Sequence, residues 1–210
     1  KNKKKINEKN LKKNGKFLYM SSTEIYSGNT KLCNENDIGN TTPKHPRSSY
    51  IESKKFGESF LINSRNDFLI YRVCLTYGPG AKLNDERVLN LLILRSIKNK
   101  KIDIYGGLNQ LRSNLFINDA INMIIKSTVK YKRQIFNINN HKMTTIGEMV
   151  KTISKISHKK FINHKSFLKG SPKIIKISNK KILNGIHYRI STSLKEGLLK
   201  TFNWYSNLVN

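Results

Sequence analysis

Cysteine and tryptophan are scarce in this sequence, with two cysteines (Cys33 and Cys74) and one tryptophan among 210 residues. Two cysteines exclude a disulfide-rich secreted scaffold and a four-cysteine zinc site. A membrane-spanning helix needs about 18 consecutive apolar residues, and the best candidate, 88–97, is short and contains Asn90 and Arg95. We therefore predict a protein without a membrane span.

Length and apolar content favour a folded protein. A chain of 210 residues with 37% hydrophobic residues suggests one domain, or a large and a small lobe, with a core that needs no metal or disulfide. We see no internal repeat and no Pro-rich or Gly-rich linker. Residues 1–16 are rich in lysine and lack the apolar stretch of a secretory signal, so we expect a cytoplasmic location.

Acidic residues are few, with 13 Asp+Glu against 40 Lys+Arg and a net charge of +27. Such a charge is typical of proteins that bind nucleic acid or an anionic surface. However, only eight of the basic residues are arginine, whose planar fork grips phosphate and guanine, while Asn and Ile each occur 26 times. Lys, Asn and Ile have A+T-rich codons, so we interpret the charge as compositional drift. Nucleic acid should bind only nonspecifically, at low salt.

Short apolar runs and helical spacing alternate along the chain. Strands are predicted at 17–20, 68–74, 101–105 and 134–138, and helices at 49–63, 86–98 and 119–129. Asp119 is the predicted N-cap of the third helix. Thr145 with Glu148, and Ser193 with Glu196, have the spacing of capping boxes. Strands separated by helices predict an α/β fold with a doubly wound parallel sheet.

Tyr50 and Lys54 stand four residues apart, which places them on one face of the predicted helix 49–63. A phenol alone has a pKa near 10 and is a poor base at neutral pH. An ammonium about 5 Å away favours the phenolate by roughly 3 kcal/mol at an effective dielectric near 20. That effect would make Tyr50 a usable acid and base.

Further motifs flank this pair in a fixed order. They are SSTEIY (21–26), the proline-containing loop 43–47, RVCLTYGPG (72–80), NDERV (84–88), GLNQLRS (107–113) and FIND (116–119). With these motifs, residues 17–210 resemble the extended short-chain dehydrogenase/reductases, the NAD-dependent epimerase/dehydratase family. The runs that contain Arg87 and Arg112 most resemble the UDP-glucuronate decarboxylases of that family.

The resemblance implies a truncated Rossmann-type doubly wound parallel sheet with a smaller C-terminal substrate-binding lobe. Residues 1–76 and 112–140 would form the later part of the NAD-binding Rossmann domain, and 77–111 and 141–210 the substrate-binding lobe. The family's Gly-x-x-Gly-x-x-Gly turn, which cradles the NAD pyrophosphate, is absent from this sequence. We therefore expect the first strands and helices of the Rossmann half to be missing.

The resemblance also implies roles at the nicotinamide end. Ser22 would hydrogen-bond the sugar O4, and Tyr50 would remove or return the O4 proton. Lys54 would lower the pKa of Tyr50 and hold the nicotinamide ribose. Ser21, Tyr50 and Lys54 would contact the cofactor.

Other positions bear on substrate choice. Sugar 4,6-dehydratases of the family have an Asp where this chain has Thr23, so Glu24 fits the decarboxylase glutamate better. Arg112 would pair with the sugar carboxylate or the diphosphate, and Arg87 would contact the nucleotide. The family's substrate-binding Asn is replaced here by Leu75.

The function expected from the resemblance is decarboxylation of UDP-glucuronate through a 4-keto sugar, with NAD as cofactor and a nucleotide-diphosphate sugar as partner. The first alternative is a nucleotide-sugar 4-epimerase. A second is an inactive truncated remnant or a basic nucleic-acid-binding module, because the phosphate-binding turn is missing and the charge is +27. The family also implies a homodimer formed through the helix that carries Tyr50 and Lys54. The five histidines lack metal-ligand spacing, so no metal site is expected.

Overall fold

The computed structural model describes residues 15–99, 101–105, 107–164 and 175–209. The strands are β1 (Lys16–Ser22), β2 (Asp67–Val73), β3 (Leu75–Tyr77), β4 (Lys101–Tyr105), β5 (Leu111–Arg112), β6 (Asn114–Phe116), β7 (Gln134–Ile138), β8 (Thr144–Thr145) and β9 (Lys160–His164). The helices are α1 (Ser48–Ile62), α2 (Val88–Lys98), α3 (Ile117–Lys130), α4 (Ile146–Ser157), α5 (Lys180–Gly185) and α6 (Leu194–Val209), with a 3-10 turn, η2 (Thr23–Tyr26).

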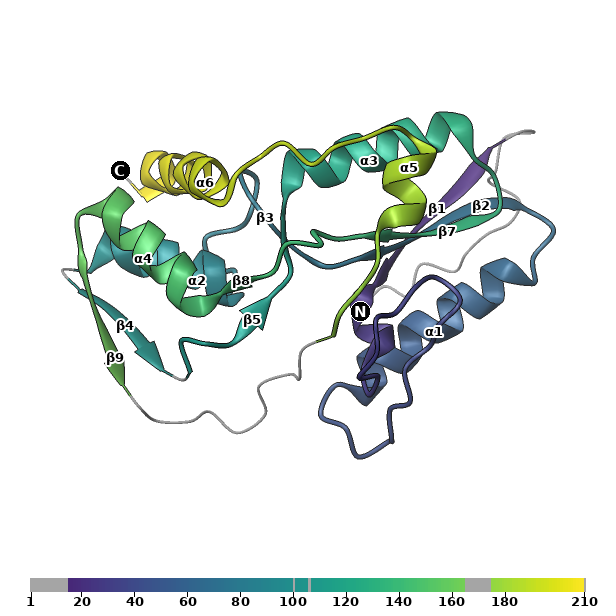
Figure 1. The fold of residues 1–210 in the computed structure, drawn as a ribbon, viewed down its shortest axis with the longest axis horizontal. Coiled ribbons are helices and arrows are strands. Elements are labelled where there is room, and N and C mark those ends of the chain that lie inside the picture. The colour runs from purple at the N-terminus through teal and green to yellow at the C-terminus, as the bar shows by residue number, and fades with distance from the viewer. Residues whose placement is uncertain (1–14, 100, 106, 165–174, 210) are drawn as a thin grey trace.

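A parallel sheet of order β1-β2-β7 carries the site. Its two faces bury different clusters. Leu61 of α1 packs with Phe68 and Ile70 of β2 on one face, whereas Leu69 of β2 packs with Met123 of α3 on the other. Helices α1 and α3 therefore cover opposite faces (Figure 1). The predicted α/β fold with a parallel sheet is confirmed.

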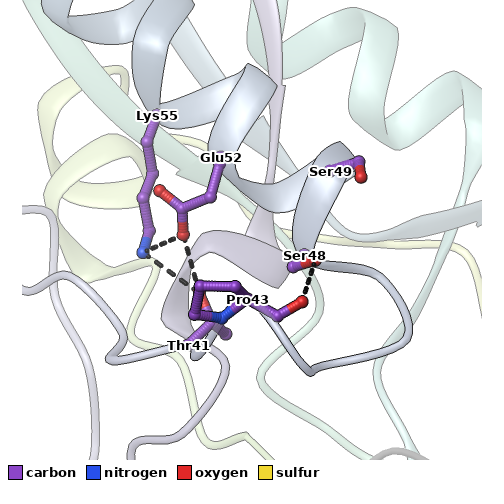
Figure 2. Close-up of a pocket in the computed structure, with 6 residues that line it drawn as sticks. All are labelled: Thr41, Pro43, Ser48, Ser49, Glu52 and Lys55. Atoms are coloured by element: carbon purple, nitrogen blue, oxygen red, sulfur yellow. Dashed lines mark hydrogen bonds and ion pairs between the residues drawn. The ribbon is translucent and has the colours of Figure 1, made fainter.

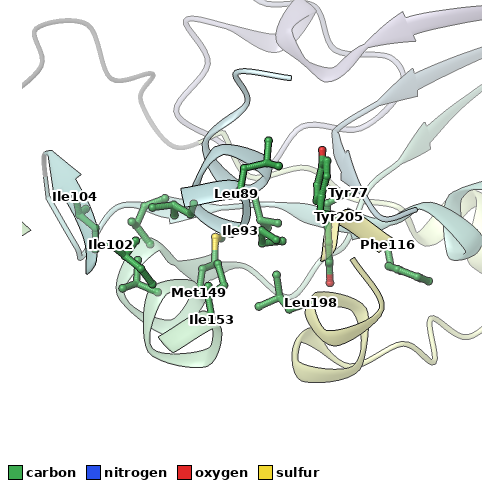
Figure 3. Packing of buried hydrophobic residues seen from close by; sticks show 14 residues of the cluster. Tyr77, Leu89, Ile93, Ile102, Ile104, Phe116, Met149, Ile153, Leu198 and Tyr205 are labelled. Carbon is green, nitrogen blue, oxygen red and sulfur yellow. The ribbon is translucent and has the colours of Figure 1, made fainter. Parts of the chain in front are cut away.

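Helices α2, α4 and α6, with β4, β5, β8 and β9, lie at the far end of the molecule, whereas α5 lies beside α3 and β7 (Figure 1). Two small parallel pairs, β3–β6 and β4–β9, and an antiparallel pair, β5–β8, join segments that are distant in sequence. Helices α2, α4 and α6 pack there around a buried cluster that includes Ile93, Met149, Leu198 and Tyr205 (Figure 3). The assignment of 77–111 and 141–210 to a substrate-binding lobe stays a prediction.

Most element predictions lie within two residues of the observed bounds, but the N-cap prediction at Asp119 is wrong. Helix α3 begins at Ile117 after the extended Phe116, and Asp119 is buried inside its first turn. The Asp119 carboxylate instead accepts a hydrogen bond from the Tyr188 hydroxyl (2.6 Å). The capping box of Thr145 and Glu148 is present as predicted.

No helix in the described part of the chain is long and apolar enough to cross a membrane. Within the same residues, no group of three or more His, Cys, Asp or Glu side chains is arranged to hold a metal ion.

A buried ion pair joins α1 to the sheet. Arg72 on β2 donates from Nε and Nη2 to the Glu58 carboxylate (3.1, 3.2 and 2.7 Å), and both side chains are at most 3% exposed. The Ser21 hydroxyl at the end of β1 donates to the same carboxylate, and Arg72 Nη1 donates to the Tyr26 hydroxyl (2.7 Å). One carboxylate on α1 thus bonds to both β1 and β2.

We predict that Glu58→Ala lowers the free energy of unfolding by about 3–5 kcal/mol, because it leaves the Arg72 guanidinium buried without its counter-ion. Urea denaturation followed by circular dichroism measures this loss. The matched control is Glu196→Ala, which breaks the exposed Lys200–Glu196 pair and should cost less than about 1 kcal/mol. Equal, small losses in the two variants would contradict the structural importance of the Glu58 pair.

Candidate functional site

The carboxyl end of β1 presents the two serines singled out in the sequence. Ser21 and Ser22 are both buried, and the chain turns there into η2. Ser22 is the N-cap of that turn, and its Oγ accepts a hydrogen bond from the Glu24 backbone N–H (3.2 Å). Ser21 points toward α1, where it donates to Glu58. The two hydroxyls therefore have different surroundings. The Ser21 hydroxyl bonds the carboxylate of the buried Arg72–Glu58 ion pair.

Tyr50 and Lys54 lie beside this strand end on α1. Lys54 Nζ donates to the Met20 carbonyl oxygen of β1 (2.8 Å) and lies 5.7 Å from the centroid of the Tyr50 ring and 5.2 Å from that of Tyr19. Tyr50 is 38% exposed, so a ligand can reach its phenol. The ammonium is thus held between the phenol ring and the end of β1.

Glu24 and Arg47 form an ion pair next to Tyr50. Arg47 Nε and Nη2 both donate to the Glu24 carboxylate, the latter over 2.7 Å. The guanidinium carbon also lies 4.8 Å from the Tyr50 ring centroid. The neighbouring carboxylate raises the pKa of Arg47 above its ordinary value. Sequence reasoning missed Arg47, although its place in the proline-containing loop just before the Tyr50 helix was a signal.

Arg87 and Arg112 line a second, narrow pocket together with Leu75, Asn114 and Met149. Arg87 forms a bidentate pair with Asp85 and donates to the Thr76 carbonyl oxygen (3.0 Å). Arg112 donates to Gln110 Oε1 (2.8 Å) and to the Leu111 carbonyl oxygen (2.9 Å). Burial lowers the pKa of Arg112 from its ordinary value. The structure therefore groups Arg87 with Arg112, and Tyr50 with Lys54, Glu24 and Ser22.

A larger, open pocket of about 470 Å³ lies at the start of α1 (Figure 2). It is lined by Thr41, Pro43, Ser48, Ser49, Glu52 and Lys55. Glu52 and Lys55 are paired with each other (3.0 Å), and Lys55 also donates to the Thr41 hydroxyl. Helical periodicity places these α1 residues on the side opposite Tyr50 and Lys54. Glu52 and Lys55 in this pocket are thus already paired with each other, and we assign the pocket no role in the chemistry.

A family model, "NAD dependent epimerase/dehydratase family", matches residues 5–139, more than half of the chain. The chain belongs to this family. Among curated relatives, UDP-glucuronic acid decarboxylase 1 of Danio rerio is 23% identical over 201 residues, which cover 91% of this chain and 47% of the relative. Human dTDP-D-glucose 4,6-dehydratase is 25% identical over 203 residues, covering 90% and 56%. The chain thus spans about half the length of the curated relatives that it matches.

Solved structures of two 4-epimerases share the fold. UDP-glucose 4-epimerase of Thermotoga maritima with UDP-glucose superposes with a TM-score of 0.81 at 21% identity, covering 93% of this chain and 64% of that one. UDP-glucuronic acid 4-epimerase of Bacillus cereus in complex with UDP-glucuronic acid and NAD gives 0.77 at 23% identity, covering 92% and 62%. At these identities the likeness establishes the fold.

Cys74 lies directly before Leu75 at the carboxyl end of β2, so its reactivity bears on the site. Its thiol is buried, which raises the pKa from 9.0 to about 11. Burial also raises the pKa of Cys33. The thiolate is the nucleophilic form, so burial makes both thiols poorer nucleophiles at neutral pH than a free cysteine.

We predict that a Cys33→Ser chain, which retains only Cys74, reacts with a disulfide reagent at pH 8 at least about a hundredfold more slowly when folded than in urea. A rise of two pKa units reduces the thiolate fraction about a hundredfold at a pH below both values. Labelling should become faster as the pH rises toward 11. Rapid labelling of the folded chain at pH 8 would contradict a buried, protonated Cys74.

Proposed function

We propose that this chain is part of an enzyme that modifies nucleotide sugars by NAD-dependent oxidation at the sugar C4, with UDP-glucuronate decarboxylation as its reaction. The observation that carries the proposal is the position of Lys54 Nζ, which bonds the end of β1 and lies 5.7 Å from the Tyr50 ring centroid. The ammonium, the phenol ring and the strand end thus meet at one place. An accessible tyrosine so placed is suited to take a proton from a sugar hydroxyl.

Each group at the strand end has a step. Tyr50 takes the proton from O4 as the C4–H bond breaks, and Ser22 hydrogen-bonds O4 to orient it. NAD, when bound, would supply the hydride-transfer chemistry at C4. Lys54 stays bonded to the end of β1 beside the Tyr50 ring.

The residues fit one end of NAD. Lys54 and the Tyr50 hydroxyl would hold the nicotinamide ribose, since both lie at the carboxyl end of a parallel strand, where such ligands bind. Ser21, which the family resemblance places at the cofactor, is buried and bonded to Glu58, so it would act by positioning α1. For the pyrophosphate, the sequence contains no Gly-x-x-Gly-x-x-Gly turn.

The carboxyl group decides the outcome once C4 is a ketone. A C6 carboxylate is then β to the carbonyl, so the C5–C6 bond can break with release of CO2, and its electron pair passes into an enolate that is protonated at C5. Thr23 is not an acid, which argues against loss of a C6 hydroxyl as in a 4,6-dehydratase. Glu24 lies in the same turn, η2, as Thr23. Its carboxylate is paired with Arg47, which lies over the Tyr50 ring.

The pocket of Arg87 and Arg112 would take the nucleotide and the diphosphate. A guanidinium suits phosphate oxygens, and Arg112 is one of two arginines that line this pocket. Leu75 lines it where the family has an Asn, so the polar contact of that Asn is replaced by an apolar one.

A 4-epimerase is the first alternative, supported by the likeness of the fold to two 4-epimerases. The same Tyr50 and Lys54 would serve it. The two reactions differ at C6, because decarboxylation releases one CO2 per turnover and epimerisation leaves the mass unchanged. Mass spectrometry of the product from UDP-glucuronate separates them.

The second alternative is an inactive remnant or a basic binding module, and the charge of +27 favours the binding module. Titration of the chain with NAD distinguishes this alternative from an NAD-dependent enzyme. Micromolar affinity would exclude the remnant, whereas salt-resistant, sequence-selective binding of nucleic acid would exclude the enzyme.

We also propose that the protein forms a homodimer through α1. Phe56 and Phe60 lie one turn apart on that helix and are 73% and 41% exposed. Exposed aromatic side chains at this spacing are suited to helix–helix packing.

We predict that Tyr50→Phe lowers turnover of UDP-glucuronate by about 10²–10⁴-fold and changes its affinity by less than about twofold, because the ring remains and only the acid/base hydroxyl is lost. Product mass spectrometry and calorimetry measure the two effects. Tyr131→Phe removes a hydroxyl that, among the described residues, bonds the Gly185 carbonyl, and serves as the control. Activity that survives in Tyr50→Phe would refute the assignment.

A further inference from the structure

Arg47 is the guanidinium in contact with both the Glu24 carboxylate and the Tyr50 ring. It occupies the N-cap position of α1, and its side chain is 53% exposed. Nε and Nη2 donate to Glu24, while Nη1 has no hydrogen-bond partner among the described residues. An anionic ligand can therefore reach the guanidinium from solvent.

The chemistry of the proposed substrate limits where its carboxylate can lie. In a hexuronate, O4 and the C6 carboxyl carbon are separated by three covalent bonds, about 3 Å across space. A substrate whose O4 reaches the Tyr50 hydroxyl therefore brings its carboxylate into the immediate surroundings of Tyr50. A cation that recognises the carboxylate must lie there as well.

Arg47 lies next to Tyr50, where the substrate carboxylate would be. Arg87 and Arg112 point to Asp85 and Gln110, and neither has a contact with Tyr50 or Glu24 in the described part of the chain. Arg47 also offers a planar fork, which binds a carboxylate through two parallel hydrogen bonds.

We propose that Arg47 binds the carboxylate of the uronate substrate, and that Glu24 competes with this carboxylate for the guanidinium. This inference rests on the proposed function. In the ligand-free chain, Glu24 neutralises Arg47 through an ion pair whose side chains are 53% and 32% exposed. Exposed pairs are weak and exchange readily with other ions. Arg47 thus makes the site selective for acidic over neutral sugars, and its transfer to the substrate releases the Glu24 carboxylate beside C5 and C6.

The test is calorimetry of the 210-residue chain with NAD present, titrated with UDP-glucuronate and with UDP-glucose. Arg47→Gln should lower the affinity for UDP-glucuronate by about tenfold or more and change the affinity for UDP-glucose by less than about twofold. Only the binding of UDP-glucuronate loses a charge-assisted pair. Glu24→Gln should raise the affinity for UDP-glucuronate by about threefold, because it removes the carboxylate that competes with the substrate for Arg47. Arg47→Lys keeps the positive charge but lacks the planar fork, so its affinity for UDP-glucuronate should lie between those of Arg47→Gln and the unchanged chain.

Lys31→Gln is the matched control, because it removes the exposed lysine of an ion pair with Asp37, which has no contact with Tyr50 in the described part of the chain, and should leave both affinities unchanged. Equal losses for both sugars in Arg47→Gln, no loss in either, or weaker uronate binding in Glu24→Gln would overturn the inference and leave the proposed function standing. Failure of the wild-type chain to bind either sugar would overturn both. Melting temperatures of all variants check that the fold is retained.

Discussion

The ion pair between Arg72 and Glu58 sets the geometry of the site. Burying two charges is costly unless their hydrogen-bonding capacity is met. Here Arg72 bonds through Nε, Nη1 and Nη2 to the Glu58 carboxylate, the Tyr26 hydroxyl and two loop carbonyls, and Glu58 also accepts from Ser21. These bonds join α1, β1, β2, η2 and the loop at 35–37. Because Tyr50 and Lys54 precede Glu58 by two turns and one turn of α1, the pair determines which way they face.

Close packing of α1 on β1 supports the same geometry. Gly57 lies against the Tyr19 ring, and a Cβ at that position would be 2.2 Å from the Tyr19 hydroxyl oxygen. The absence of a side chain lets the helix approach the strand closely enough for Lys54 to reach the Met20 carbonyl. The buried charge thus fixes the direction of the helix, while the glycine fixes its distance from the strand.

Local patterns predicted the parts of the site that depend on neighbours in sequence. The spacing of Tyr50 and Lys54 determines their common helix face, and the apolar run before Ser21 determines the strand end. The partnership of Glu58 with Arg72, and that of Arg47 with Glu24, could not be predicted, because each joins two elements whose relative position depends on the tertiary fold. Parallel pairs such as β4–β9 were missed for the same reason. Asp119 shows the converse, since a distant tyrosine overrode a local capping preference.

The use of arginine also clarifies the unusual charge. Arg47, Arg72 and Arg87 each grip a carboxylate through more than one nitrogen, and Arg133 donates to three backbone carbonyls. A lysine could not reproduce these forked contacts, because its ammonium is a point charge. In a chain with 40 Lys+Arg, of which eight are arginine, the rarer residue thus occupies positions where geometry matters. Lysine supplies the other 32 of these basic residues and most of the positive charge, so the net charge alone is a poor guide to what this protein binds.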